Sequence, residues 1–148
     1  MYTVDDFIPH RDRMKIINDI VEVDDVHCVT QSIATSLWPL CDGGQINSII
    51  IVELVAQTAS VFAGWQKLNK TKIRGEGVIV GIKKVVLTVP AIPVGSRLRT
   101  SCRMLVNLDE QYGEFEGEVK DDHTSYGRVH LQTLSAQNIT SGSRGILP

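Results

Sequence analysis

The longest run of apolar residues in the chain extends from Ile49 to Leu68 and contains no proline. When this run is wound at 3.6 residues per turn, apolar side chains lie on every side, which is typical of a helix that is buried all round. Asn47 or Ser48 is a suitable N-cap for it. The pattern therefore predicts one long central helix.

On both sides of this helix the apolar positions alternate with polar ones, and this alternation predicts strands. Two strands precede the helix and four follow it, over Lys15–Asp24, Val26–Thr35, Gly77–Val89, Arg97–Leu108, Tyr112–Lys120 and Ser125–Ala136. Gly81 interrupts the first strand after the helix and indicates a bulge or a close approach of backbone or ligand. Two strands, a buried helix and a meander of four strands form an α+β plan, with the helix on an antiparallel sheet.

Length and composition fit one domain, which we expect over residues 1–136, followed by a polar, Gly/Ser-rich and flexible tail over 137–148. The formal net charge is −2, so no general attraction to nucleic acid or anionic lipid is implied. Cys28, Cys41 and Cys102 are scattered, without the spacing of a zinc site or a disulfide framework. We expect no metal and no cofactor. The cysteine usage and the charged N-terminus, which is unlike a signal peptide, predict a cytoplasmic protein.

The apolar run is about as long as a membrane span, so a membrane helix is the first alternative. Glu53, Gln57 and Lys67 fall inside it, however, and the chain has no second span. Because charge inside a bilayer is costly, we favour a core helix and expect no membrane association.

Glu53 is the only acid in the apolar run, and Gln57 follows one helical turn later on the same face. Burial would favour the protonated form of Glu53 and would be costly without partners or a function. Glu53 is therefore either a catalytic acid or base, or a structural group bonded to a neighbouring strand. Ser60 and Gly64 extend the same face, as a packing contact or as a substrate track.

Four histidines are candidates for proton transfer near pH 7: His10, His27, His123 and His130. His123 lies in a predicted turn, and His27 and His130 lie mid-strand, where surface positions are the commoner interpretation. His10 follows a proline in a constrained segment, which makes it the stronger candidate. No nucleophile elbow, phosphate loop or dinucleotide fingerprint is present.

Three ordered segments resemble the hot-dog-fold 3-hydroxyacyl-[acyl-carrier-protein] dehydratases, especially the branch of aryl-polyene-type gene clusters. Ile8-Pro9-His10-Arg11, continuing to Asp19-Ile20-Val21, resembles the opening motif of that family. Glu53-Leu54-Val55-Ala56-Gln57 resembles its central-helix signature, and residues 78–98 resemble its "G-(I/T)-(K/R)-(K/R)…P-x-x-P-G-D-x-L" segment. The resemblance implies a curved antiparallel sheet wrapped around one long helix, with acyl tunnels at a dimer interface.

One family feature is missing, since the loop before the helix reads Leu37-Trp38-Pro39-Leu40-Cys41 and lacks the usual catalytic histidine. Either His10 takes that role, or the protein is a hot-dog domain without dehydration chemistry.

By this resemblance, Glu53 would be the acid and His10 the base in dehydration of a 3-hydroxyacyl carrier-protein thioester to the trans-2-enoyl thioester, with His10 from either subunit. Gln57 would orient Glu53 or a water, and Gly81 would let the pantetheine arm pass. Backbone N–H groups around Gly44 would polarise the thioester carbonyl. The implied partners are an acyl carrier protein and a second copy of the chain, as a homodimer or higher oligomer. A hot-dog thioesterase and a non-catalytic acyl-binding partner remain alternatives.

Overall fold

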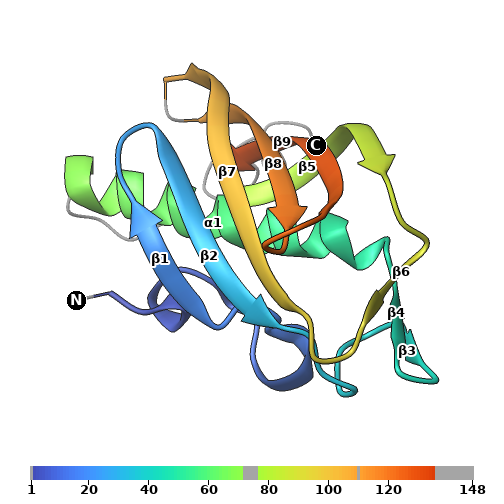
Figure 1. Ribbon diagram of the computed structural model, residues 1–148. Helices are drawn as coiled ribbons and strands as arrows, with labels where there is room; N and C mark the ends of the chain where they lie inside the picture. The colour runs from blue at the N-terminus through green and yellow to red at the C-terminus, as the bar shows by residue number, and fades with distance from the viewer. Residues whose placement is uncertain (1, 72–76, 110, 136–148) are drawn as a thin grey trace, which may run out of the picture.

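The computed structural model describes residues 2–71, 77–109 and 111–135. Its central element is the helix α1 (Ile50–Thr71). Within the described residues, six strands form an antiparallel sheet in the order β1 (Asp19–Val23), β2 (His27–Ile33), β7 (Arg97–Leu108), β8 (Tyr112–Lys120), β9 (Ser125–Ser135) and β5 (Gly77–Leu87). A second, small sheet contains β3 (Cys41–Asp42), β4 (Gln45–Asn47) and β6 (Ala91–Pro93) (Figure 1).

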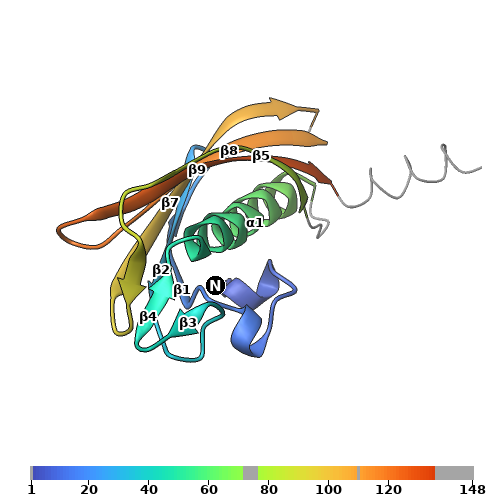
Figure 2. The same ribbon diagram turned by 90° about the vertical axis from the view of Figure 1, so that its right-hand side faces the viewer.

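The large sheet curves over one side of α1, and the N-terminal segment lies against the other side (Figure 2). The helix contacts β2, β7, β8, β9 and β5 in turn. Its side chains Ile51, Leu54 and Phe62 are fully buried, and Phe62 packs edge-on against Phe115 of β8. This is the α+β hot-dog arrangement that the sequence predicted.

Helix and sheet approach each other closely because β8 has no side chain at Gly117. A Cβ atom there would lie 2.5 Å from Cγ1 of Val55 on α1. Any larger residue would therefore push the helix off the sheet, at the cost of the dispersion contacts that close packing provides.

The N-terminal segment contains two short 3₁₀ helices, η1 (Val4–Asp6) and η2 (Asp12–Met14). Val4, Phe7 and Ile8 are buried against the core. A Cβ at Gly64 would come within 2.9 Å of Phe7 Cδ1. Gly64 therefore serves the packing of the N-terminal segment on α1, which is the packing alternative for this helix face.

The predicted elements differ from the structure at several boundaries. Lys15–Asn18 is not part of β1, because Ile16 and Ile17 turn inward and are buried beside the helix. The predicted loop before the helix and the turn around Ala91 contribute the small sheet instead. The predicted four-strand meander is wrong for β5, which pairs with β9 at the sheet edge and not with β7.

The structure also places the cysteines and the glycine of β5. Cys28 and Cys102 are buried and Cys41 is half-buried, all as free thiols. The strand β5 has a register shift between Ile79 and Gly81, as the glycine suggested. Of the described helices, none combines the length and hydropathy that a bilayer crossing requires. The predicted tail over 137–148 lies outside the described residues.

Candidate active site

His10 and Glu53 lie in contact, although they are far apart in sequence. His10 Nε2 is 3.1 Å from Glu53 Oε1 within one chain. Glu53 occupies the first turn of α1, and His10 lies in the extended segment between η1 and η2. The sequence identified both residues as candidates, and the structure brings them together without help from a second subunit. The catalytic roles of both residues stay predictions.

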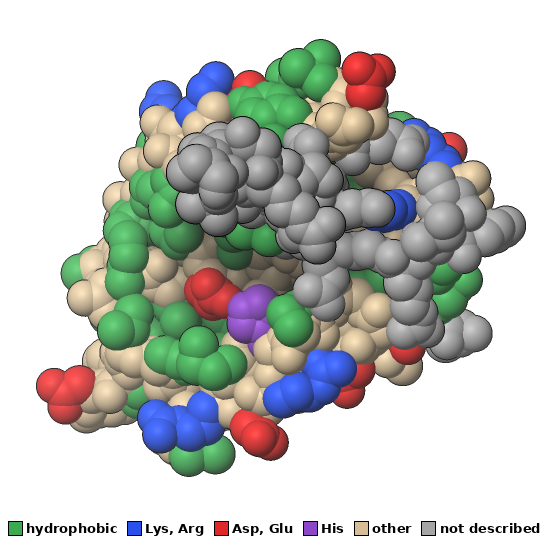
Figure 3. Space-filling model, turned by 180° about the vertical axis from the view of Figure 1, so that it is seen from behind, with side chains coloured by type: hydrophobic (Ala, Val, Ile, Leu, Met, Phe, Trp, Pro, Cys, Tyr) green, Lys and Arg blue, Asp and Glu red, His purple; other side chains and the backbone are tan. Residues whose placement is uncertain are grey.

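Glu53 is less buried than the sequence suggested. Its side chain keeps 36% of its accessible surface, and that of His10 keeps 28%. The reason is that the helix is not covered all round: the face that carries Glu53 opens beside the N-terminal segment. Figure 3 shows a histidine and an acidic side chain side by side in a hollow of this face, with hydrophobic side chains around them.

Gln57, fully buried one turn after Glu53, connects the helix to the N-terminal segment. Its Nε2 donates to Glu53 Oε1 (2.9 Å) and to the Met14 carbonyl (2.7 Å). Its Oε1 accepts from the backbone N–H of Ile16 (3.1 Å). Because the backbone N–H requires an acceptor, the orientation of the amide is fixed and Gln57 must be a donor to Glu53. The expected orienting contact is therefore present, while direct substrate binding by Gln57 stays a prediction.

The start of α1 is capped by a side chain. Asn47 Oδ1 accepts from the backbone N–H of Ile49 over 3.0 Å. Gly44 lies farther away, in the turn between β3 and β4, where Gly43 and Gly44 have φ values of 58° and 78°. These left-handed conformations suit a tight hairpin turn. The structure thus places Gly44 before the helix and not at its N-terminus, and a substrate contact there stays a prediction.

Gly81 makes its nearest contact on the outer face of the sheet, away from α1. A Cβ at this position would collide with Oε1 of Gln132 on β9. The amide of Gln132 in turn donates to the Tyr112 hydroxyl over 2.7 Å. The end of the Gln132 side chain would have to move to admit a Cβ at this position. A role of Gly81 in passing the pantetheine arm stays a prediction.

A second polar cluster, on the outer face of the sheet, was not expected from the sequence. Glu114 is contacted by His130 Nε2 (2.7 Å), Lys83 Nζ (3.1 Å) and the Tyr112 hydroxyl (2.8 Å). The Tyr112 hydrogen bond, followed by those of Lys83 and His130, lowers the pKa of Glu114 to about 2. From the sequence, His130 had been interpreted as a surface group. The pairing of β9 with β8 on one side and with β5 on the other brings these residues together.

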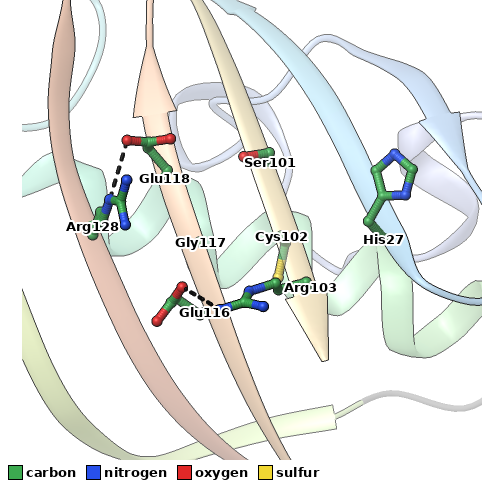
Figure 4. A pocket seen from close by; sticks show the side chains of 8 residues that line it. All are labelled: His27, Ser101, Cys102, Arg103, Glu116, Gly117, Glu118 and Arg128. Atoms are coloured by element: carbon green, nitrogen blue, oxygen red, sulfur yellow. Dashed lines mark hydrogen bonds and ion pairs between the residues drawn. The ribbon is translucent and has the colours of Figure 1, made fainter. Parts of the chain in front are cut away.

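The same outer face carries a hollow of about 310 Å³ between β2, β7, β8 and β9 (Figure 4). Its charges are already paired, with Arg103 at 3.1 Å from Glu116 and Arg128 at 3.2 Å from Glu118. It lies across the sheet from α1 and does not contain His10 or Glu53. Among the described residues there is no cluster of three or more His, Cys, Asp or Glu side chains suited to a metal ion.

The family model of ApeP-like proteins, described as ApeP dehydratase, matches residues 2–142. The chain belongs to the ApeP-like dehydratase family. The hot-dog fold and the dehydratase function of the aryl-polyene type, both expected from the motifs, are thereby confirmed.

Solved structures agree with this family assignment. The dehydratase heterocomplex ApeI:P from Xenorhabdus doucetiae matches with a TM-score of 0.81 and 27% identity, over 90% of this chain and 91% of that chain. Cj0977, a sigma28-regulated virulence protein of Campylobacter jejuni, matches with a TM-score of 0.64 and 19% identity, over 88% of this chain and 84% of that chain. A hypothetical thioesterase from Streptococcus pneumoniae TIGR4, solved with coenzyme A, matches with a TM-score of 0.62 and 11% identity, over 80% of this chain and 87% of that chain. The last two share the fold alone. No curated protein matches the sequence significantly.

Proposed function

We propose that this ApeP-like protein dehydrates a 3-hydroxyacyl thioester held on an acyl carrier protein, with His10 and Glu53 as its catalytic pair. The observation that carries the proposal is the 3.1 Å contact between His10 Nε2 and Glu53 Oε1. His27 and His130 contact other acids, Glu22 and Glu114, on the sheet. His10 is therefore the histidine positioned to replace the one missing from the loop before α1.

Dehydration requires two proton transfers on neighbouring carbon atoms. His10 Nε2 removes the proton from C2 while Glu53 protonates the hydroxyl group on C3. The C2–H and C3–O bonds break, the C2=C3 double bond forms, and water leaves. His10 then carries one proton more than before and Glu53 one fewer. Because Nε2 lies 3.1 Å from Oε1, the proton passes from Nε2 to that oxygen, and both groups are neutral again. Exchange with solvent, to which Glu53 is partly exposed, then moves the proton to Oε2 before the next turnover.

The two oxygens of Glu53 have different surroundings, which supports this division of roles. Oε1 receives the Gln57 amide and contacts His10. In the part of the chain that the structure describes, Oε2 has no hydrogen-bond partner, so it can reach the substrate hydroxyl. The N-terminus of α1 lies one turn away, and its partial positive charge favours electron density on the thioester carbonyl. Between Gly44 and Ser48, the N–H groups of Asn47 and Ser48 already donate to the carbonyls of Leu40 and Pro90, at 3.1 Å each. The proposed donors to the thioester carbonyl are therefore restricted to the N–H groups nearer Gly44.

We also propose that the protein works as a homodimer or a higher oligomer in the cytoplasm. Support for an oligomer comes from β5, an edge strand with exposed apolar side chains at Val78, Val80, Ile82 and Val86. An unpaired apolar edge is a template for pairing with another chain. The relative from Xenorhabdus doucetiae is described as a heterocomplex, so the partner can also be a related hot-dog subunit.

The test is an assay of purified protein with a 3-hydroxyacyl carrier-protein thioester, with two readouts in parallel. A dehydratase yields the conjugated enoyl absorbance without free thiol. A thioesterase yields free thiol, and a non-catalytic acyl-binding protein yields neither; each of these results would overturn the proposal.

Two variants assign the catalytic pair. Glu53→Gln and His10→Asn should each lower kcat by about 10²–10⁴-fold while the protein stays folded. The matched controls Glu22→Gln and His123→Asn change the same residue types at exposed positions and should retain wild-type activity. Full activity in either site variant would remove that residue from the mechanism.

A further inference from the structure

The imidazole of His10 has only one anchor among the described side chains. Nε2 contacts Glu53, whereas Nδ1 is buried without a hydrogen-bond partner. A catalytic imidazole is usually oriented through its second nitrogen. Here the direction of the ring must instead be set by the backbone that carries it, and that backbone lies outside regular secondary structure.

Arg11, the next residue, holds this backbone with its guanidinium group. Nη1 donates to the carbonyls of Ile8 (2.6 Å) and His10 (2.7 Å). Nη2 donates to the carbonyl of Asp5 in η1 (3.1 Å). One side chain thus ties together three carbonyl groups on the N-terminal side of η2, including that of His10 itself.

The far end of this connection is fixed to the same helix that carries Glu53. Phe7 packs against Gly64 of α1, and Ile8 is buried. Asp5 is further held by Lys15, at 2.9 Å. The N-terminal segment therefore contacts α1 at two places: Phe7 packs on it at Gly64, and His10 contacts it at Glu53. The hydrogen bonds of Arg11 connect the backbone between these two places.

We propose that Arg11 is a positioning residue for His10, acting through its hydrogen bonds to the Asp5, Ile8 and His10 carbonyls and not through contact with substrate. This inference rests on the proposed function of the pair His10 and Glu53. Docking of an acidic carrier protein is the competing role for Arg11. Against it, Nη1 and Nη2 donate to the chain's own backbone, and Nη1 lies 3.7 Å from the Asp5 carboxylate.

The chemistry requires arginine specifically. The guanidinium group is a planar fork with several fixed donors, whereas an ammonium group is a point charge. Lysine at position 11 would keep the charge but could not reach carbonyls on two sides of the group at once. Arg11→Lys and Arg11→Ala should therefore behave alike, which is not expected if the charge itself is what matters.

The experiment compares these two variants with Arg99→Lys, a control on the exposed outer face of β7. Each is assayed on a carrier-linked 3-hydroxyacyl thioester and on the same acyl group attached to free pantetheine. Positioning predicts that kcat per folded molecule falls by about 10- to 100-fold on both substrates. KM should change by less than about threefold. Arg99→Lys should match the wild type.

Other outcomes overturn the proposal. A raised KM for the carrier-linked substrate alone, with activity retained in Arg11→Lys, would assign Arg11 to carrier docking. Lower thermal stability with unchanged kcat per folded molecule would assign it a structural role only. If Arg11→Ala fails to fold, Arg11→Lys still decides between these results.

A spectroscopic readout separates this inference from the proposed function. In protein labelled with ¹⁵N at the histidine rings, the His10 Nε2 signal should show the hydrogen bond to Glu53 and should lose it in Glu53→Ala. Arg11→Lys should weaken the same signature. If the wild type dehydrates none of the thioesters, the proposed function fails, yet the signal still tests whether Arg11 positions His10. An unchanged Nε2 signal in Arg11→Lys would refute that role.

Discussion

Gln57 Nε2 donates to Glu53 Oε1 over 2.9 Å, across one turn of α1. The same amide satisfies the Met14 carbonyl and the Ile16 N–H, so one side chain both orients the candidate acid and attaches the N-terminal segment to the helix. The arrangement couples the stability of this segment to the geometry of the site.

Replacing Gln57 by alanine should destabilise the protein by about 3 kcal/mol. The buried N–H of Ile16 and the half-buried carbonyl of Met14 both lose their partner, and a cavity remains. Urea unfolding would measure the loss. Gln111→Ala, at an exposed position in the turn between β7 and β8, is the control and should change stability by less than about 0.5 kcal/mol. A loss below about 1 kcal/mol in Gln57→Ala would mean that the Gln57 hydrogen bonds are not needed to hold the N-terminal segment on the helix.

Gly117→Ala should destabilise the fold by about 1–3 kcal/mol, because its Cβ would overlap Val55 on α1. The destabilisation caused by Gly117→Ala should be smaller when Val55 is also replaced by alanine, because the new methyl group at position 117 then occupies the space that the valine side chain has left. A double-mutant cycle on unfolding free energies checks this coupling. Strict additivity of the two substitutions would contradict the close contact between helix and sheet.

The Glu114 cluster predicts a pH dependence of stability. The folded pKa of Glu114 is lowered to about 2, below its ordinary value of 4.5, chiefly by the Tyr112 hydroxyl and then by Lys83 and His130. A lowered carboxyl pKa stabilises the fold fully above pH 4.5, and this contribution is lost as the pH falls from 4.5 towards 2. Wild type should therefore exceed Glu114→Gln in unfolding free energy at pH 6, with a difference that narrows towards pH 2.

The measurement is denaturant unfolding of both proteins at several pH values. Asp122→Asn, in the exposed turn between β8 and β9, is a suitable control. Its unfolding free energy should differ from that of the wild type by the same amount at every pH. A difference between wild type and Glu114→Gln that is constant from pH 6 to pH 2 would show that ionisation of Glu114 does not contribute to stability.

The periodicity of apolar residues predicted those helices and strands whose burial repeats regularly along the chain. The apolar run of α1 and the alternation of β7 and β8 mark these elements closely, because burial of alternate or helically spaced residues is visible in the sequence. The position of β5 beside β9 is not visible there, because strand order depends on which distant edges pair. The short strands β3 and β4 were missed because two or three residues carry no measurable period.

The site was predicted in the same uneven way. Glu53 and Gln57 stand out as polar residues in an apolar helix, and His10 is indicated both by its place after a proline and by the family motif. The exposure of Glu53 was not foreseen, because it depends on where the N-terminal segment lies. The hydrogen bonds of Arg11 go to backbone carbonyls, which every residue has, so no residue pattern indicates them.

The exposed edge strand β5 provides the last prediction, on assembly. Ile82 and Val80 are about half exposed, at 51% and 49%, on a strand whose outer edge pairs with no described strand. Ile82→Lys should raise the Kd of the proposed homodimer by about 100-fold, because each of two related lysines would lose water at a cost above about 1.4 kcal/mol. Light scattering over a range of protein concentrations measures the change. Val26→Lys, at a 71% exposed position between β1 and β2, is the matched control and should leave the dimer intact. A wild-type protein that stays monomeric at every concentration would contradict the homodimer and favour a different subunit on this edge.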